Sequence, residues 1–178
     1  MSTAGGTGPD GDLRARFVAG MGAVACTVNV VTTDGLAGRH GVTVSAMASV
    51  SADGERPTLL VCIHHLSQAA AAILGNRVFC LNTLNADQVR VSDAFAGRGL
   101  ATGRDKFDAV RWSAGTATGA PHIAEALVAF ECRLLSAARV GTHYVVIGAV
   151  EDVHRATAGE PLVYASRAYG THRPLAAG

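Results

Sequence analysis

The chain has 178 residues, of which 49% are hydrophobic and 16% are charged. These values are typical of one globular domain with a sizeable core, and they exclude a disordered chain. The formal net charge is only +1, and the 15 basic and 14 acidic residues are scattered without long runs. Neither a nucleic acid nor an anionic membrane surface is therefore predicted as a partner.

The start of the chain is Gly-rich and lacks the basic residues and apolar middle of a secretory signal. We expect a disordered tail over residues 1–11 and a single domain over residues 12–178, located in the cytoplasm. The four cysteines are far apart, form no C-x-x-C pair and have apolar neighbours, which predicts buried, reduced thiols. The longest apolar stretch, residues 17–31, is interrupted by Gly and polar residues and is too short to cross a bilayer.

The first expected elements are a helix and a strand. Asp12 can cap a short helix. Apolar residues recur every four positions at Leu13, Phe17 and Met21, so we expect this helix to cover the mouth of a sheet. Residues 24–33 are rich in Val and Thr and end at an Asp-Gly pair, which is typical of a strand and a hairpin turn.

The next segment, Gly41 to Ser51, alternates between apolar and hydroxyl-bearing side chains. Because successive side chains of a strand point to opposite faces, this pattern predicts one strand with a greasy face and a hydroxyl-lined face. A stripe of small hydroxyls beside exposed backbone suits a flat polar ligand. An edge strand whose outer face is only solvated has the same pattern, and on this segment alone we favour that interpretation.

Four further elements follow in the middle of the chain. A continuous apolar run over residues 58–64 predicts a central strand. Ser67 can cap an Ala-rich helix that ends at Gly75. A short strand over residues 78–83 comes next, and residues 85–88 resemble a capping box that opens another helix.

The last third of the chain is rich in strands. The Gly- and Arg-rich stretch 96–106 predicts a loop, where ligand contacts concentrate. Residues 127–139 and 143–155 predict a long β-hairpin, and residues 161–169 predict a last strand. Because strands outnumber helices without regular alternation, we expect a mainly β fold: an antiparallel barrel with a few short covering helices.

Local motifs for nucleotide, nucleophile or metal chemistry are not convincing. Residues 6–11 match G-x-G-x-x-G, but no strand precedes them, and no G-x-S-x-G elbow occurs. His64 and His65 are adjacent and would point to opposite faces of a strand, and no other histidine has metal-ligand spacing, so no metal site is predicted. His143 follows a hairpin at a strand mouth, where it could reach a ligand, although an exposed structural histidine fits the same position.

Eight segments between about residues 13 and 170 resemble, in order, the flavin reductase-like domain of two-component flavin-dependent monooxygenases. The resemblance implies a split β-barrel, usually a homodimer, that transfers a hydride from NADH or NADPH to FAD or FMN. It also implies that the diffusible reduced flavin serves a separate flavin-dependent monooxygenase. The segments are CTVNVVTT from Cys26, HGVTVSAMASVS from His40, PTLLVCIHHLSQAAAAI from Pro57, FCLNTLNADQ from Phe79, DKF from Asp105, ALVAFECRL from Ala126, GTHYVVIGAVEDV from Gly141 and PLVYASRAY from Pro161.

The resemblance reverses the interpretation of the striped segment, which it assigns to the flavin. Ser49 and Ser51, with Val50 between them, would lie nearer the ribityl and phosphate groups. Ser67 and Gln68 would donate to phosphate oxygens at a helix N-terminus, where the helix dipole also favours an anion. The residues that would meet the flavin ring through backbone and hydroxyl groups are Gly41, Thr43, Val44, Ser45 and Ala46.

The same resemblance assigns the rest of the site. Asn82 would lie beside the ring edge, and Lys106 and Phe107 would close over the outer part of the cofactor. His143 is the catalytic candidate, on the nicotinamide side of the flavin, and Tyr169 is a second nicotinamide-side candidate. Hydride transfer of this kind needs no acid–base triad, because the flavin accepts what the nicotinamide releases.

Two departures from the family pattern leave details open. Thr142 replaces the usual Asp, and Ser67-Gln68 replaces the commoner S-x-T, so the choice between NADH and NADPH and the phosphate contacts are not settled. FAD is slightly preferred to FMN. The alternatives are a flavin-binding storage or electron-carrier protein without nicotinamide turnover, a pyridoxamine-phosphate oxidase-like enzyme, for which the basic cluster is missing, and a plain β-barrel interaction module.

Overall fold

The computed structural model describes residues 9–99 and 104–175, and within them the fold is mainly β with three α-helices. All the strand pairs of the largest sheet are antiparallel. Its strands, in chain order, are β2 (Asn29–Thr33), β3 (His40–Val44), β4 (Met47–Ser51), β5 (Thr58–His64), β6 (Val78–Thr83), β9 (Val128–Val140) and β10 (His143–Arg155).

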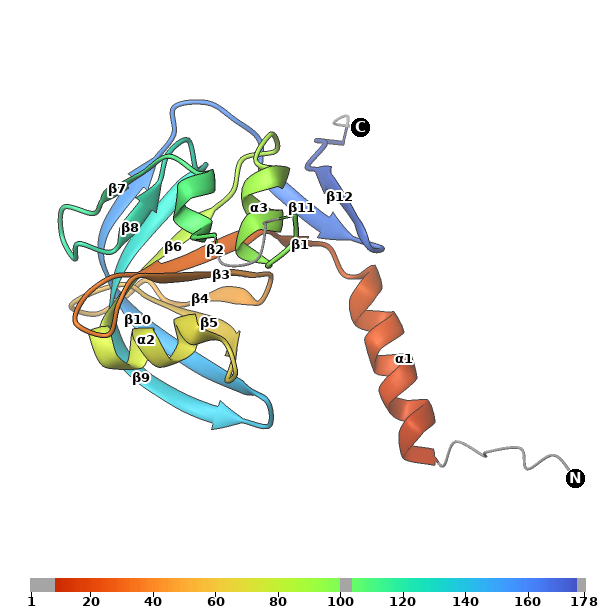
Figure 1. The fold of residues 1–178 in the computed structure, drawn as a ribbon. Coiled ribbons are helices and arrows are strands. Elements are labelled where there is room, and N and C mark those ends of the chain that lie inside the picture. The colour runs from red at the N-terminus through yellow and green to blue at the C-terminus, as the bar shows by residue number, and fades with distance from the viewer. Residues whose placement is uncertain (1–8, 100–103, 176–178) are drawn as a thin grey trace, which may run out of the picture.

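This seven-stranded sheet closes into a split barrel. Its spatial order is β3-β2-β6-β9-β10-β5-β4, so the two outermost strands, β3 and β4, follow one another in the chain. Only Ser45 and Ala46 lie between them. The sheet curls round until its two edges meet at this linker (Figure 1). The predicted mainly β barrel is confirmed.

Smaller elements surround the barrel. Strands β1, β11 and β12 form a three-stranded sheet, and β7 pairs with β8. Their bounds are β1 (Cys26–Thr27), β7 (Trp112–Ala114), β8 (Pro121–Ile123), β11 (Leu162–Ala165) and β12 (Ala168–Thr171). The helices are α1 (Pro9–Ala23), α2 (Gln68–Asn76) and α3 (Val89–Phe95), with a 3-10 turn, η1 (Lys106–Ala109).

The apolar side chains form two main clusters. One fills the barrel and includes Val31, Val61, Ile73 and Phe79. The other joins α3, η1, β8 and β11 and includes Val28, Phe95, Phe107, Ile123 and Leu162. Burial of such side chains is the main favourable contribution to folding.

The segment from Gly41 to Ser51 is two strands and not one, so the single-strand prediction is wrong. β3 pairs with β2, whereas β4 pairs with β5 on the other side of the split. Even-numbered residues face the barrel core before the linker and an odd-numbered residue faces it afterwards, because Val42, Val44 and then Met47 all pack against the core. The hydroxyl stripe is therefore not continuous across Ser45 and Ala46.

Helix α2 begins after Ser67, as predicted, but it does not end at Gly75. It continues to Asn76, and Arg77 takes the left-handed conformation with φ 65°. Gly75 has another role, since a Cβ built there would lie 2.7 Å from the Cβ of Ala37. The glycine thus allows the β2–β3 connection to approach the helix closely.

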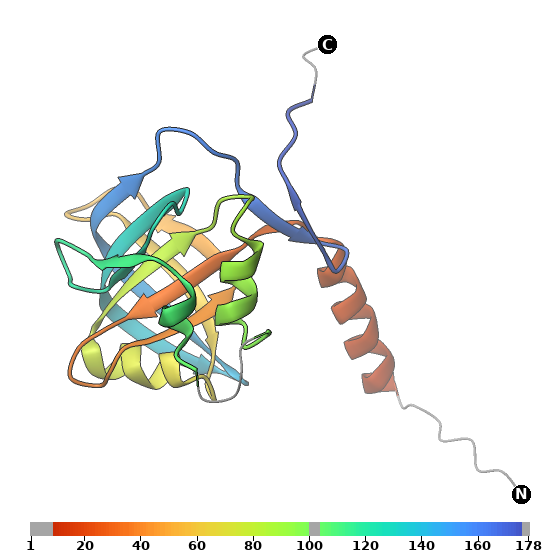
Figure 2. The same cartoon turned by 45° about the horizontal axis from the view of Figure 1, so that its top comes forward.

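Helix α1 projects away from the barrel, as Figures 1 and 2 both show. Leu13, Phe17 and Met21 are exposed, Phe17 to 65%. The prediction that this helix covers the mouth of a sheet is therefore wrong for a single chain. Among the residues that the structure describes, no helix is long and apolar enough to cross a membrane.

Both ends of the domain differ from expectation. Helix α1 starts at Pro9, inside the predicted tail, and residues 1–8 of that tail lie outside the described residues. The predicted last strand, 161–169, is a tight hairpin of β11 and β12. Ser166 and Arg167 form its turn with φ values of 50° and 63°, which residues other than glycine and asparagine seldom adopt.

Candidate functional site

Strand β3 has one unpaired edge, because β2 is its only ladder partner in the described sheet. An edge strand presents N–H and C=O groups that can bind a polar ligand. The described structure has a pocket at each end of this strand, one beside Gly41 and one beside Thr43 to Ser45. Ser45 follows Gly41 by four positions, which is a span of about 13 Å in extended chain.

The first pocket, called here the α2 pocket, has a volume of about 430 Å³. It lies between β3, η1 and the N-terminus of α2. The Ser67 side chain makes no capping hydrogen bond in the described structure, so the first turn of α2 retains N–H groups that favour an anion. The pocket is lined by Arg39, His40, Gly41, Ser67, Gln68, Ala69, Arg104, Asp105, Lys106 and Phe107.

Lys106 joins this pocket to the edge strand. Its Nζ donates to the carbonyl oxygen of Gly41 at 3.3 Å and to that of Phe95 at 2.9 Å. Burial lowers the pKa of Lys106 from its usual value, because an ammonium group loses hydration inside the protein. The side chain is therefore held in place, with a partly desolvated positive charge facing the pocket.

Arg39 is held more firmly still. Its guanidinium carbon lies 4.6 Å from the ring centroid of Trp112 and 4.9 Å from that of Phe107. Its Nη2 donates to Asp105 at 3.0 Å, and the Phe107 N–H, together with Arg39, holds the pKa of Asp105 below its usual range despite burial. Arg39 Nε is buried and has no hydrogen-bond partner among the described residues. An orphaned donor in a cationic pocket fits an anionic ligand group.

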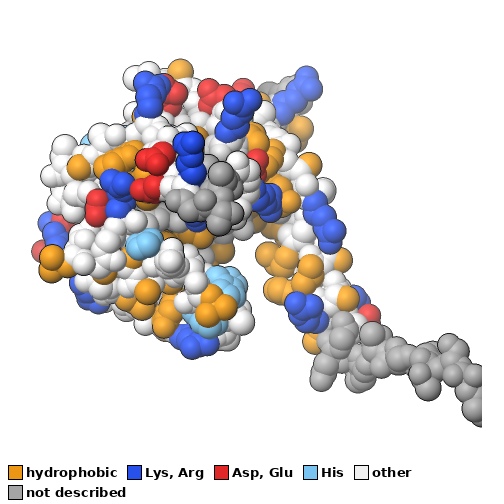
Figure 3. Space-filling view, in the orientation of Figure 1, with side chains coloured by type: hydrophobic (Ala, Val, Ile, Leu, Met, Phe, Trp, Pro, Cys, Tyr) orange, Lys and Arg blue, Asp and Glu red, His pale blue; other side chains and the backbone are white. Residues whose placement is uncertain are grey.

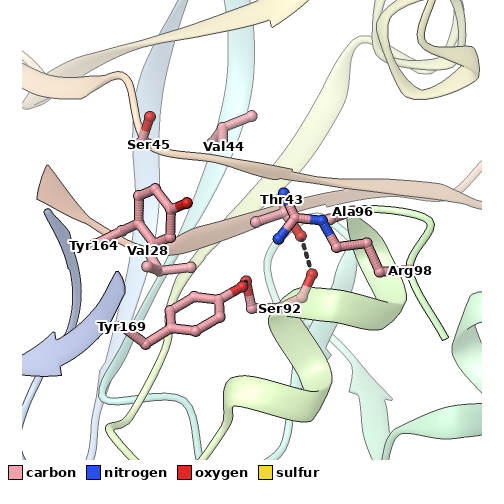
Figure 4. A pocket seen from close by; sticks show the side chains of 9 residues that line it. All are labelled: Val28, Thr43, Val44, Ser45, Ser92, Ala96, Arg98, Tyr164 and Tyr169. Atoms are coloured by element: carbon pink, nitrogen blue, oxygen red, sulfur yellow. Dashed lines mark hydrogen bonds between the residues drawn. The ribbon is translucent and has the colours of Figure 1, made fainter. Parts of the chain in front are cut away.

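The second pocket, called here the tyrosine pocket, has a volume of about 220 Å³ and is shown in Figure 4. The rings of Tyr164 and Tyr169, from β11 and β12, lie 5.3 Å apart in an edge-to-face arrangement. Such a pair can pack against a flat ring. The other lining residues come from the β1–β2 junction, from β3 and the linker, and from the α3 side: Val28, Thr43, Val44, Ser45, Ser92, Ala96 and Arg98.

A hydrogen-bond network fixes the walls of the tyrosine pocket. The Tyr169 hydroxyl donates to Asp93 Oδ1 at 2.9 Å, and Ser92 Oγ lies 2.9 Å from the same hydroxyl. Burial and the Asp93 carboxylate raise the pKa of Tyr169, against the opposing effect of Ser92. The hydroxyl therefore remains a neutral donor. Thr43 Oγ1 donates to the backbone carbonyl of Ser92 at 2.7 Å and ties β3 to α3.

His143 lies beyond the linker, at the start of β10. The Cys62 N–H donates to the Ala46 carbonyl at 3.0 Å, so the linker runs beside β5. Two residues farther along β5, His64 pairs with His143 of β10. Because neighbouring strands are about 4.8 Å apart and two residues of strand span about 6.6 Å, His143 lies about 12 Å from the linker.

The structure gathers most of the predicted site residues around β3. Ala46 lies in the exposed linker between the two strands. Five of the residues line the α2 pocket: Gly41, Ser67, Gln68, Lys106 and Phe107. Four others line the tyrosine pocket: Thr43, Val44, Ser45 and Tyr169.

The remaining predicted residues lie elsewhere. Ser49, Val50 and Ser51 belong to β4 and line a separate hollow of about 230 Å³. Asn82 is fully buried. Its amide donates to the Val30 carbonyl at 3.1 Å and accepts from the Ile123 N–H at 2.9 Å, so the structure gives it a place in the core and none beside either pocket.

Several pocket residues are absent from the sequence-based set. Tyr164, Ser92 and Arg98 line the tyrosine pocket but lie on separate elements. Only Tyr164 could have been found, through its spacing to Tyr169 across a turn that has no glycine. No local motif could have added Ser92 and Arg98.

One group among the described residues has a spacing that suits a metal ion: Glu131, Asp152 and His154. Glu131 is fully buried and accepts hydrogen bonds from His154 Nε2, Thr118 Oγ1 and backbone N–H groups of residues 116–118. Its oxygens are thus already satisfied by donors. We interpret this cluster as a clamp on the β7–β8 turn.

Comparison with known proteins gives consistent matches. The family model described as "Flavin reductase like domain" matches residues 21–173. The "FMN reductase (NADH) RutF" of Escherichia coli K12 is 42% identical over 149 residues, which cover 84% of this chain and 88% of that protein.

Two solved structures extend the comparison to the fold. BorF, the flavin reductase component of a bacterial two-component tryptophan halogenase, is 31% identical, with a TM-score of 0.78, and the match covers 88% of this chain and 97% of BorF. The Streptomyces globisporus C-1027 NADH:FAD oxidoreductase SgcE6 is 26% identical, with a TM-score of 0.81 and coverage of 99% and 96%.

Proposed function

The chain belongs to the flavin reductase-like family, and from that premise we propose that it transfers a hydride from NADH to FMN and releases the reduced flavin to a partner oxygenase. The protein is an oxidoreductase of the NADH-dependent flavin reductase family. FMN is proposed ahead of FAD, and NADH ahead of NADPH. The support for both choices is the name of the 42% identical relative, an FMN reductase that uses NADH.

The observation that carries the proposal is the pair of pockets along the unpaired edge of β3. FMN is an elongated molecule with a flat ring at one end and a phosphate at the other. The α2 pocket supplies Lys106, the orphaned Arg39 Nε and a helix N-terminus, which suit a phosphate. The tyrosine pocket and the linker supply apolar walls and exposed backbone, which suit a ring.

In the proposed complex the protein binds and orients two flat molecules. A bound flavin accepts the hydride that the nicotinamide releases. Backbone N–H groups of β3 and the linker at Ser45 and Ala46 would donate to the flavin ring, where negative charge develops. His143 would contact the nicotinamide, whereas Tyr169 lines the pocket proposed for the flavin ring. Close stacking of the two rings replaces acid–base chemistry.

Release of the reduced flavin is proposed from the relatives. BorF, at 31% identity, is one component of a two-component halogenase. Both pockets of this chain open to solvent along an edge strand, which is compatible with a flavin that enters and leaves. We therefore propose that a separate flavin-dependent monooxygenase uses the product. The four free cysteines are compatible with the proposed cytoplasmic location.

A homodimer is proposed from two unpartnered apolar surfaces. Leu59, Val61 and Ile63 face the barrel core, so the alternate residues of β5 face outward. With their cross-strand neighbours on β4 and β10 they form a partly exposed apolar face: Ala48, Leu60, Cys62, Val145 and Ile147. The exposed apolar residues of α1 add to it. A second copy of the chain would bury these surfaces, and Leu60→Glu is expected to give monomers by sedimentation analysis.

The test is the steady-state oxidation of NADH by protein stripped of flavin. We expect turnover only after free flavin is added, with a higher kcat/KM for FMN than for FAD and for NADH than for NADPH. Faster turnover with FAD or NADPH would reverse that choice and keep the reductase. Flavin binding without oxidation of either nicotinamide would instead favour a flavin carrier or storage protein.

A further inference from the structure

Three imidazole rings gather at the mouth of the barrel around His143. The ring centroids of His64 and His143 are 5.1 Å apart, with an angle of 84° between the planes. His65 stacks on His64 at 5.0 Å and 20°. The prediction that His64 and His65 point to opposite faces is wrong, because β5 ends at His64 and the chain turns at His65. Figure 3 shows imidazole side chains gathered near the tip of the β9–β10 hairpin.

His64 is itself fixed on two sides. The Leu66 N–H donates to its Nδ1 at 3.2 Å, so the proton of the neutral ring is on Nε2 while this bond holds. The His65 N–H donates to the Thr142 carbonyl at 2.9 Å and fastens the end of β5 to the hairpin. The His64 ring is therefore held in one orientation, although its side chain is exposed.

The orientation of the His143 ring depends on its contact with the His64 ring. Its Nδ1 lies 3.0 Å from Thr142 Oγ1, and within the described structure Nε2 has no hydrogen-bond partner. An exposed side chain at the start of a strand would otherwise change rotamers freely. The contacts with Thr142 and with the His64 ring restrict the His143 side chain and leave Nε2 available to a ligand.

The surroundings of His65 disfavour a positive charge on its ring. Burial lowers the pKa of His65, and so do the neighbouring Arg139, His64 and His143, with no carboxylate among the groups that act on it.

We propose that His64 is a positioning residue that holds the His143 ring with Nε2 directed at the nicotinamide of NADH. This inference rests on the proposed function, in which His143 lies on the nicotinamide side of the flavin. It gives His64 a role that acts on the nicotinamide half-reaction and not on flavin binding. The acceptor at Nδ1 orients His64, and the edge-to-face contact with the His64 ring orients His143.

The test compares His64→Ala, His64→Phe and His143→Ala with the control His172→Ala, an exposed histidine on the C-terminal segment. We expect His64→Ala to lower kcat/KM for NADH by about tenfold, because a small misplacement of a contacting group is costly. The FMN dissociation constant is expected to stay within about twofold. His64→Phe should regain most of the activity, since its ring restores the edge-to-face contact.

A spectroscopic measurement separates positioning from folding. Imidazole ¹⁵N resonances of labelled protein report the tautomer and environment of each histidine ring. In His64→Ala the His143 resonances should shift toward those of a free histidine, while the backbone amide spectrum outside the hairpin and the end of β5 stays unchanged. In His172→Ala both should match the wild type.

The outcomes distinguish the proposed role of His143 at the nicotinamide from the positioning role of His64. If His143→Ala is impaired with NADH and His64→Ala is not, the positioning role is overturned and the proposed function stands. If His143→Ala keeps wild-type turnover, the proposed role of His143 fails and the inference fails with it. If His64→Ala and His64→Phe are equally impaired, or if FMN binding falls in parallel, the role of His64 is structural and the inference is overturned.

Discussion

The Thr43 hydroxyl donates a 2.7 Å hydrogen bond to the backbone carbonyl of Ser92, and this bond fastens the free edge strand to α3. A side chain that sequence comparison assigns to a flavin contact is thus used inside the protein. The part of β3 that remains available to a ligand is its unpaired backbone edge. The Thr43 bond and the hydrogen bond from Lys106 to the Gly41 carbonyl hold that edge in position. The site is therefore built on a strand whose position depends on α3 and η1.

Thr43→Val is expected to lower the free energy of unfolding by about 1 kcal/mol, because the isosteric side chain cannot donate to the Ser92 carbonyl. FMN affinity should fall with it as the edge of β3 loosens. Urea unfolding and flavin titration measure the two effects. Thr43→Ser keeps the donor and should stay near the wild type, and a fully stable Thr43→Val protein would contradict this role.

Gly41→Ala is expected to destabilise the protein by about 1–3 kcal/mol through overpacking. A Cβ at position 41 would lie 2.4 Å from Cε1 of Phe95, on the face of β3 covered by α3. Thermal and urea unfolding measure the loss. Gly170→Ala is the matched control, since nothing lies within 4 Å of a Cβ there. Adding Phe95→Leu should recover part of the stability, and no recovery would argue against this contact.

Lys106→Met is expected to weaken FMN binding by about 10- to 100-fold, the equivalent of about 1.5–3 kcal/mol for a charged hydrogen bond. Riboflavin, which has no phosphate, should bind the variant almost as well as it binds the wild type. Fluorescence titration with both flavins gives the ratio directly. Equal weakening for FMN and riboflavin would show that Lys106 only supports the carbonyls of Gly41 and Phe95.

Glu131→Gln is expected to lower the free energy of unfolding by about 1–3 kcal/mol at pH 7, because it breaks a buried network. Burial alone would raise the pKa of Glu131, but hydrogen bonds from His154, Thr118 and the neighbouring backbone outweigh it and lower the pKa. A carboxyl with a lowered folded-state pKa stabilises above its unfolded value of about 4.3, and the contribution disappears as pH falls through the folded value.

The quantity to follow is the difference in the free energy of unfolding between the wild type and Glu131→Gln. It should shrink as the pH falls below about 4.3. Urea unfolding at several pH values measures it. A difference that grows below about pH 4.3 would contradict the lowered pKa. His172→Ala serves as a control for the general effect of acid on the fold.

Strands β5 and β6 could be predicted to the residue because each is an apolar run with clear punctuation at its ends. The break in the striped segment could not be predicted. Apolar and hydroxyl residues continue to alternate through Ser45 and Ala46, and only the choice of ladder partner, β2 before the break and β5 after it, separates the two strands. That choice is a long-range property of the barrel.

The site residues also divide into those that local sequence could predict and those whose place depends on long-range contacts. Ser67 and Gln68 are adjacent in the chain and line the α2 pocket together, while their contact with a phosphate stays a prediction. Asn82 could not be placed, because a polar residue in an apolar strand marks a site and a buried hydrogen-bond centre equally well. The tyrosine pocket depends on Ser166 and Arg167 adopting positive φ, which turns β12 back against β11 and brings Tyr169 to Asp93.

The measurement that tests the central claim most directly is anaerobic mixing of flavin-stripped protein with equimolar FMN and NADH. The account predicts that the absorbance of oxidised FMN and of NADH disappear together, one for one, many times faster than in the absence of protein. If FMN binds but both absorbances stay constant, the chain does not transfer a hydride between them, and the reductase account is contradicted.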